Sequence, residues 1–129
     1  MDDFNIELKA SKNCIKANFD NNSDGITISF SGAIDDKNPE DYLLPFFIKV
    51  HEKIVETNTK YLNLNLKELT FLNSSGIKCF VQLVSLMLKL PEDKRYNLKM
   101  KIDASSQWQN TSFSLLKTVN KEHIVIEKI

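Results

Sequence analysis

The chain has 129 residues, of which 42% are hydrophobic and 26% charged, and its 17 basic residues balance 17 acidic ones. This length and composition indicate a single globular domain, residues 1–129, that buries a core without disulfides or metal. A neutral chain lacks the basic surface from which nucleic-acid binding usually starts, so no nucleic-acid partner is expected.

Neither a membrane nor a secretory route is indicated by the sequence. No apolar run approaches the roughly 20 residues that span a bilayer, and the start has no signal-peptide pattern. The two cysteines, Cys14 and Cys79, are far apart and match no metal-ligand spacing. Unpaired thiols are typical of a reducing cytoplasm, which is where we place the chain. No metal or other cofactor is expected.

The first part of the chain predicts short antiparallel strands. Apolar residues alternate with polar ones at residues 4–8, 15–19 and 26–30, and residues 20–25 are dense in turn-forming types. We therefore predict a short N-terminal strand and a β-hairpin. Gly32 is where we expect the chain to leave this sheet.

A helix is predicted between residues 39 and 57. Apolar residues recur there at i, i+4, i+7 and i+11 from Leu43 to Ile54, which is the spacing of one helical face. Pro45 predicts either a kink in this helix or its first turn. His51, at the edge of the face, is expected to be a half-buried packing residue.

Strands and helices alternate through the rest of the chain. Strict alternation predicts a strand at residues 61–67, followed by a short turn and a helix from about residue 74 to 90. A strand near 98–102, a helix capped by Ser105 or Ser106, and a strand at 124–126 follow. This order predicts an α/β fold with a mixed, largely parallel sheet, an N-terminal β-hairpin and helices packed against the sheet.

The predicted last helix carries Trp108 on a face that it shares with Ser112, Leu115 and Val119. We interpret Trp108 as buried in the core, with a partner-binding role as the alternative.

The helix after Asn73 has two apolar stripes, although a helix on one sheet needs only one. The first, expected to face the sheet, comprises Ile77, Phe80, Val81, Val84 and Leu88. The second comprises Cys79, Leu83, Leu86 and Leu90. Either the helix at residues 39–57 packs on this second stripe, or part of it stays exposed as a partner-docking surface.

Ser74 and Ser75 stand where this helix begins. The structural interpretation is that Asn73 or Ser74 caps the helix by accepting a bond from a free backbone N–H. The functional interpretation is that Ser75, or alternatively Ser74, is a phosphoacceptor. A phosphate at a helix N-terminus meets unpaired N–H donors and the positive end of the helix dipole. Gly76 would allow a kinase or phosphatase to approach the serine closely.

The residues around this corner resemble a known family. Residues 64–66 (Leu-Asn-Leu), residues 69–77 with their Asn-Ser-Ser-Gly-Ile ending, and residues 32–35 (Gly-Ala-Ile-Asp) are similar to the signature of STAS domains, specifically the stand-alone bacterial anti-sigma factor antagonists. The resemblance implies the STAS α/β fold. It also implies two partners: a serine kinase that doubles as an anti-sigma factor and binds the unphosphorylated chain, and a PP2C-type phosphatase. It places the phosphoacceptor at Ser75.

The expected partner-binding surface comprises Asp35, Asn73, Ser74, Gly76, Lys78, Cys79, Gln82, Leu83 and Leu86. The sequence departs from the family at Asn65 and Asn73, where relatives carry aspartates, and this makes it a divergent branch. The leading hypothesis is a phosphorylation-controlled protein-binding switch that acts in transcription regulation. The alternative is a constitutive adaptor or dimerisation module without phosphorylation. No nucleophile–base pair, carboxylate pair or phosphate loop suggests an enzyme, and the oligomeric state is left open.

Overall fold

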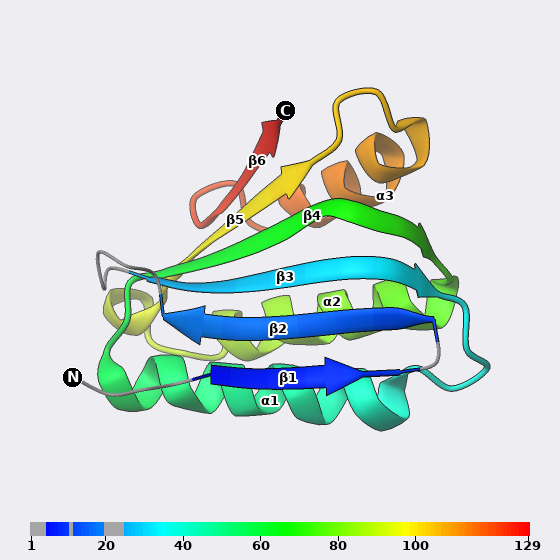
Figure 1. The fold of residues 1–129 in the computed structure, drawn as a ribbon. Coiled ribbons are helices and arrows are strands. Elements are labelled where there is room, and N and C mark those ends of the chain that lie inside the picture. The colour runs from blue at the N-terminus through cyan, green and yellow to red at the C-terminus, as the bar shows by residue number, and fades with distance from the viewer. Residues whose placement is uncertain (1–4, 11, 20–24) are drawn as a thin grey trace.

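The computed structural model describes residues 5–10, 12–19 and 25–129. These residues form one six-stranded sheet whose strands lie in the order β1-β2-β3-β4-β5-β6 (Figure 1). The strands are β1 (Asn5–Lys9), β2 (Asn13–Phe19), β3 (Gly25–Ile34), β4 (Tyr61–Leu72), β5 (Asn97–Ile102) and β6 (Ile124–Lys128). The helices are α1 (Glu40–Thr57), α2 (Ser74–Leu88) and α3 (Gln107–Lys117), with a short 3-10 turn at Glu92–Lys94.

The sheet is mixed, as predicted. β1 and β2, and β2 and β3, pair antiparallel, whereas β3–β4, β4–β5 and β5–β6 pair parallel. The predicted fold class, a largely parallel α/β sheet with an N-terminal hairpin, is confirmed. Of the segment predicted as the hairpin turn, residues 20–24 lie outside the described residues, as does Phe4.

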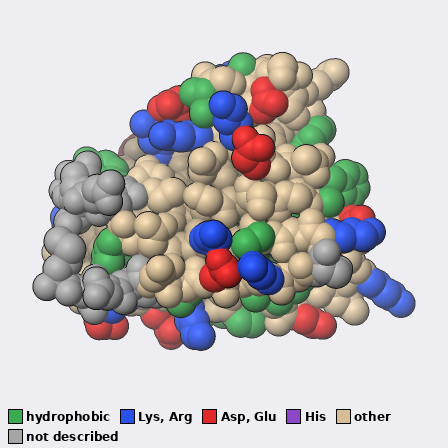
Figure 2. Space-filling model, viewed as in Figure 1, with side chains coloured by type: hydrophobic (Ala, Val, Ile, Leu, Met, Phe, Trp, Pro, Cys, Tyr) green, Lys and Arg blue, Asp and Glu red, His purple; other side chains and the backbone are tan. Residues whose placement is uncertain are grey.

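All three helices cover the same face of the sheet, and the opposite face is open (Figure 1). Leu62, Leu64 and Leu66 of β4 are fully buried beneath the helices, while Asn63 and Asn65 point to the open side. Figure 2 views the molecule from that open side, where few hydrophobic side chains appear. Helix burial on one side and polar side chains on the other follow from the two-residue period of a strand. None of the helices in the described part of the chain is long and apolar enough to cross a bilayer.

α1 buries the predicted stripe of Leu43, Phe47, Val50 and Ile54. Pro45 does not mark the first turn of this helix, which was one of the two predictions for it. The N-cap is Pro39, whose carbonyl accepts from the N–H of Leu43 at 2.9 Å. Pro45 therefore lies inside the helix beyond its first turn, with its ring exposed.

β4 is longer than its alternation predicts and β3 extends with it. The predicted turn after residue 67 is wrong, because β4 continues to Leu72 through two register shifts against β3. Each shift places an extra residue on β4, a β-bulge, which restores the inward direction at Leu69 and again at Leu72. β3 likewise continues past Gly32 to Ile34, so the expected exit at Gly32 is also wrong.

Gly32 is required for a different reason. Its φ of +88° lies in the left-handed region, and a Cβ there would stand 2.1 Å from the Lys12 carbonyl oxygen. Only glycine avoids both the strain and the clash.

The predicted buried face of α3 is wrong. Ser106 caps this helix by accepting from the N–H of Gln109, and the buried side chains are those of Gln109, Phe113 and Leu116. Leu115, predicted to share the buried face with Trp108, is 66% exposed. The assignment failed because it left out Gln109, whose amide is buried through hydrogen bonds that the sequence does not show.

Trp108 is half-buried, with its ring centroid 6.2 Å from that of Phe113. It packs against the edge of the core, so it contacts the core but is less buried than predicted.

His51 is half-buried, as predicted, and its Nδ1 lies 2.8 Å from the hydroxyl of Tyr96. Burial lowers the pKa of the His51 imidazole. Cys14 and Cys79 are free thiols.

Candidate functional site

The corner between β4 and α2 is held by Asn73, which makes three hydrogen bonds besides the one in which its carbonyl accepts from the Ile77 N–H. Its backbone N–H donates to the Ile34 carbonyl at 3.0 Å, and its Oδ1 accepts from the Gly76 N–H at 2.8 Å. Its Nδ2 donates to the Asp36 carbonyl at 2.7 Å. Asn73 is thus the cap of α2, and it also ties the helix to the segment between β3 and α1.

A second set of polar contacts fixes that β3–α1 segment. The Tyr42 hydroxyl donates to Asp36 Oδ1 at 2.7 Å and accepts from Asn13 Nδ2, which also donates to the Ala33 carbonyl. Burial and the hydrogen bond to Asp36 raise the pKa of Tyr42 to about 12, so the hydroxyl keeps its proton. The orientation of Asp36, and through it that of Asn73, is set by this network.

Asp35 lies on the same segment but faces solvent. Its carboxylate pairs with Lys12 Nζ at 3.1 Å, and Asp35 does not line the groove beside Ser75. It remains accessible to a partner that covers this end of the sheet.

Ser75 lies in an open groove between the first turns of α1 and α2. Its side chain is half-buried, and the groove, of about 350 Å³, is lined by Glu40, Leu44, Ser75, Lys78, Cys79 and Gln82. The structure thus brings together four of the predicted site residues, Ser75, Lys78, Cys79 and Gln82. Ser74 is exposed and does not line this groove.

Two residues of the groove were missed by sequence reasoning. Glu40 and Leu44 come from the first turns of α1, on the far wall from Ser75. The signal for them was the second apolar stripe of α2: once α1 packs on that stripe, the start of α1 lies beside the start of α2.

Cys79 and Leu83 of the second stripe are buried, as expected if α1 packs on it, so this part of the stripe is not a docking surface. Cys79 and Leu83 are 2% and 1% exposed, and Leu86 is partly buried. Cys79 and Leu83, which were predicted to bind a partner, instead join the core cluster that contains Phe47 of α1. Burial, reinforced by the Glu40 carboxylate, raises the pKa of the Cys79 thiol to about 11.

The first stripe is only partly the face that α2 turns inward: Phe80 and Val84 are buried, but its other members are not fully buried. Val81, assigned to it, is 42% exposed, and Met87, assigned to neither stripe, is buried. The buried arc lies between the two stripes, and comprises Gly76, Cys79, Phe80, Leu83, Val84 and Met87.

Gly76 is buried, which corrects its predicted role as an approach route for a modifying enzyme. A Cβ at this position would stand 2.4 Å from Leu72 Cδ1 and 3.2 Å from Ile34 Cγ2. Gly76 is therefore needed where α2 crosses closely over the ends of β3 and β4.

The electrostatics of the groove favour one added anion on the α2 side. The first N–H groups of a helix have no intrahelical acceptor, and the helix dipole adds about half a positive charge there. The exposed Lys78, one helical turn after Ser75, contributes a full positive charge, whereas the negative charge of Glu40 on α1 opposes it. No group of His, Cys, Asp or Glu side chains suited to a metal ion occurs among the described residues.

Comparison with known proteins gives a fold relationship only. No family model matches the chain, and no curated protein matches it in sequence. A solved structure, that of an anti-sigma factor antagonist from Mycobacterium paratuberculosis, superposes with a TM-score of 0.53 at 13% identity, covering 98% of this chain and 86% of that one. The chain therefore has the STAS-type fold found in that anti-sigma factor antagonist.

Proposed function

We propose that the chain is a protein-binding switch controlled by phosphorylation of Ser75, with Ser74 as the alternative acceptor. In this proposal the unphosphorylated form binds a serine kinase that is also an anti-sigma factor. A PP2C-type phosphatase restores that form, and the chain regulates transcription in a bacterial cytoplasm without catalysing a reaction itself. The observation that carries the proposal is that Ser75, partly buried, lines an open groove at the N-terminus of α2.

The groove gives a physical reason for switching. A phosphate on Ser75 adds nearly two negative charges to a hollow that already holds Glu40. The N-terminus of α2 and Lys78 stabilise the phosphate locally, so the modified chain stays folded. A partner that fits the neutral groove loses its complementarity, because it must then bury or face the added charge.

Ser75 is preferred over Ser74 because of where the two side chains lie. Ser75 lines the groove together with Lys78 and Gln82, so its phosphate would stand within the surface that a partner covers. Ser74 is more exposed and lies outside the groove lining. The variant Ser74→Ala is therefore the matched control for Ser75→Ala.

The test uses purified chain, ATP and a serine kinase from the same organism. We expect peptide mass spectrometry to find phosphate on Ser75 in the wild type and in Ser74→Ala, and none on that peptide in Ser75→Ala. Calorimetry with the kinase should give equal affinity for wild type and Ser75→Ala. Affinity for Ser75→Asp should be about tenfold weaker, which corresponds to about 1.4 kcal/mol. Equal affinity for all three forms would refute the switch.

One observation favours the alternative of a constitutive adaptor or dimerisation module. The residue directly before the serines is Asn73 rather than an acid, and both ends of its amide are engaged in structural hydrogen bonds. In that case Ser75 is unmodified in protein isolated from its native cell, and substitutions there leave partner binding unchanged.

A further inference from the structure

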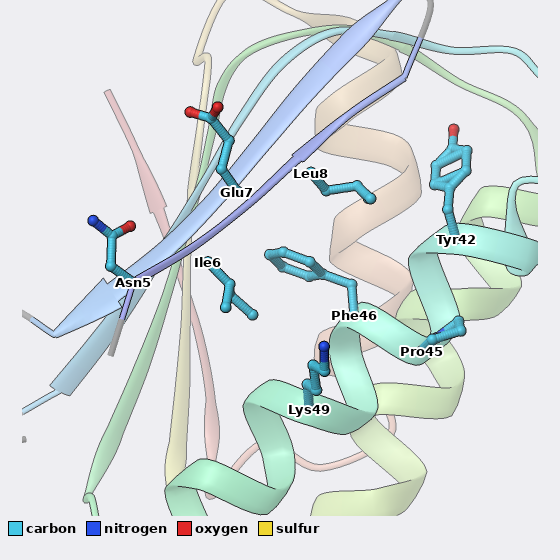
Figure 3. Close-up of a pocket in the computed structure, with 8 residues that line it drawn as sticks. All are labelled: Asn5, Ile6, Glu7, Leu8, Tyr42, Pro45, Phe46 and Lys49. Atoms are coloured by element: carbon cyan, nitrogen blue, oxygen red, sulfur yellow. The ribbon is translucent and has the colours of Figure 1, made fainter. Parts of the chain in front are cut away.

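A second groove lies at the opposite edge of the α1 helix, beside β1. It has a volume of about 520 Å³ and is lined by Asn5, Ile6, Glu7, Leu8, Tyr42, Pro45, Phe46 and Lys49 (Figure 3). This volume is in the range of ligand clefts, which is about 300–1,000 Å³. Neither the corner at Ser75 nor the switch proposed for it uses this groove.

Among the described strands, β1 lies at the edge of the sheet and is paired on one side only. It pairs with β2 only, and β2 in turn pairs with β3, so the other edge of β1 faces outward in the sheet. In an antiparallel pair, alternate residues direct their N–H and C=O groups away from the partner strand. Such groups are a template for an added strand.

Apolar side chains form one part of the groove lining. Figure 3 shows Ile6 and Leu8 of β1 and Phe46 of α1 pointing toward one another across it, with Pro45 beside them. Ile6 and Leu8 are only partly buried, although both contact the core. An added strand next to β1 would place every second side chain on this same face.

The groove carries one cation that the neighbouring residues do not neutralise. Lys49 of α1 is exposed, its side chain points into the groove, and it forms no ion pair with any described residue. Glu7 also borders the groove, but Figure 3 shows its carboxylate turned away from α1, and it pairs with Lys16 at 3.3 Å. The groove is therefore complementary to a chain that combines apolar side chains with a carboxylate.

We propose that this groove binds an extended acidic segment of a partner protein, which adds to the sheet as a new edge strand beside β1. Main-chain hydrogen bonds to β1 provide affinity, alternate apolar side chains enter the groove against Phe46, and a carboxylate reaches Lys49. A second copy of the chain fits less well: its own Ile6 and Leu8 pack against its own core and line its own groove, so they are not free to fill this one.

The test uses a fluorescent peptide of about ten residues, with alternating valine and threonine and two glutamates at one end. A matched peptide carries lysines in place of the glutamates. We expect fluorescence anisotropy to show saturable binding of the acidic peptide, and Lys49→Glu to weaken it roughly fivefold or more. The control Lys121→Glu, in an exposed loop before β6, should leave the affinity unchanged. Hydrogen exchange should slow at backbone amides of β1 when the acidic peptide binds.

Several outcomes would overturn the proposal. One is equal weakening by Lys49→Glu and Lys121→Glu, or amide protection confined to elements other than β1. Another is saturation by decanoate in place of the peptide, which would make the groove a site for small amphipathic anions. A third is a concentration-dependent dimer, seen by analytical ultracentrifugation and abolished by Lys49→Glu, which would make a second copy the occupant. Failure of the Ser75 experiment leaves this proposal unaffected, because the two grooves share no residue.

Discussion

Gln109 gives a sharp test of how the far end of β4 is held. The ladder between β4 and β5 ends at the pair Asn65–Lys101, so β4 beyond that pair has no β5 residue beside it. The side chain of Gln109, 1% exposed, hydrogen-bonds to this part of β4 in place of β5: its Nε2 donates to the carbonyls of Leu66 and Leu69 at 2.7 and 2.8 Å. Its Oε1 accepts from the N–H of Asp103 at 2.8 Å, just after β5.

The variant Gln109→Met keeps the length and shape of the side chain and removes all three hydrogen bonds. Each buried polar group left without a partner costs about 1–3 kcal/mol. The Asp103 N–H is only partly buried and recovers water, whereas the two carbonyls are buried. Burial of the apolar Met side chain returns about 1 kcal/mol. We expect the free energy of unfolding to fall by about 2–4 kcal/mol, out of a total of about 5–15 kcal/mol.

Urea unfolding followed by circular dichroism measures this change, with Gln107→Met as the control. Gln107 is exposed at the start of α3, so its substitution should change stability by less than about 0.5 kcal/mol.

A second variant, Gln109→Glu, separates hydrogen bonding from packing. The ionised carboxylate can donate to neither carbonyl, whereas the protonated acid can donate its one hydrogen to one of them, so folding raises the pKa of this group. A raised folded-state pKa means that part of the stability lost relative to wild type is recovered near pH 4, around the ordinary pKa of a glutamate, and is lost again as pH rises. If Gln109→Met costs less than about 0.5 kcal/mol, or Gln109→Glu is equally destabilised at pH 4 and pH 8, the reasoning is wrong.

Two further predictions concern Gly76 and His51. Gly76→Ala should lower stability by about 1–3 kcal/mol in urea unfolding, because the added Cβ displaces Leu72, whereas Ser74→Ala should change it by less than about 0.5 kcal/mol. The lowered pKa of His51 means that the unfolded chain binds the proton more readily, so stability should fall as pH drops below 6.5 and stay flat above it. In thermal melts, His51→Phe should remove this loss of stability at low pH, although it also removes the contact with Tyr96. If the loss of stability at low pH is unchanged in the variant, another group causes it.

The sequence was sufficient for the elements whose pattern is local. The stripe of α1 and the alternation of β2, β3 and the first half of β4 depend only on which side of each element is covered. Since one layer of helices covers one face of the sheet, a single period describes each of these elements.

The sequence was insufficient where burial is decided by two neighbours or by hydrogen bonds. α2 contacts both the sheet and α1, so its buried arc lies between the two apolar stripes and includes Met87. In β4, two bulges interrupt the alternation of apolar and polar residues, so the sequence pattern predicts a turn where the strand in fact continues. In α3, the buried Gln109 is polar, and no apolar periodicity includes it.

The same limitation applies to Asn73, the position where the sequence departs most pointedly from the family it resembles. An aspartate there would still cap α2 by accepting from the Gly76 N–H, but it has no hydrogen to donate to the Asp36 carbonyl. The asparagine thus exchanges a negative charge before Ser75 for a second hydrogen bond that fixes the β3–α1 segment. The charge that controls the Ser75 groove then comes from Glu40 and Lys78, which line it from opposite helices. We expect the kinase proposed for Ser75 to recognise this pair rather than an acid adjacent in sequence, so that its specificity would depend on the packing of α1 against α2.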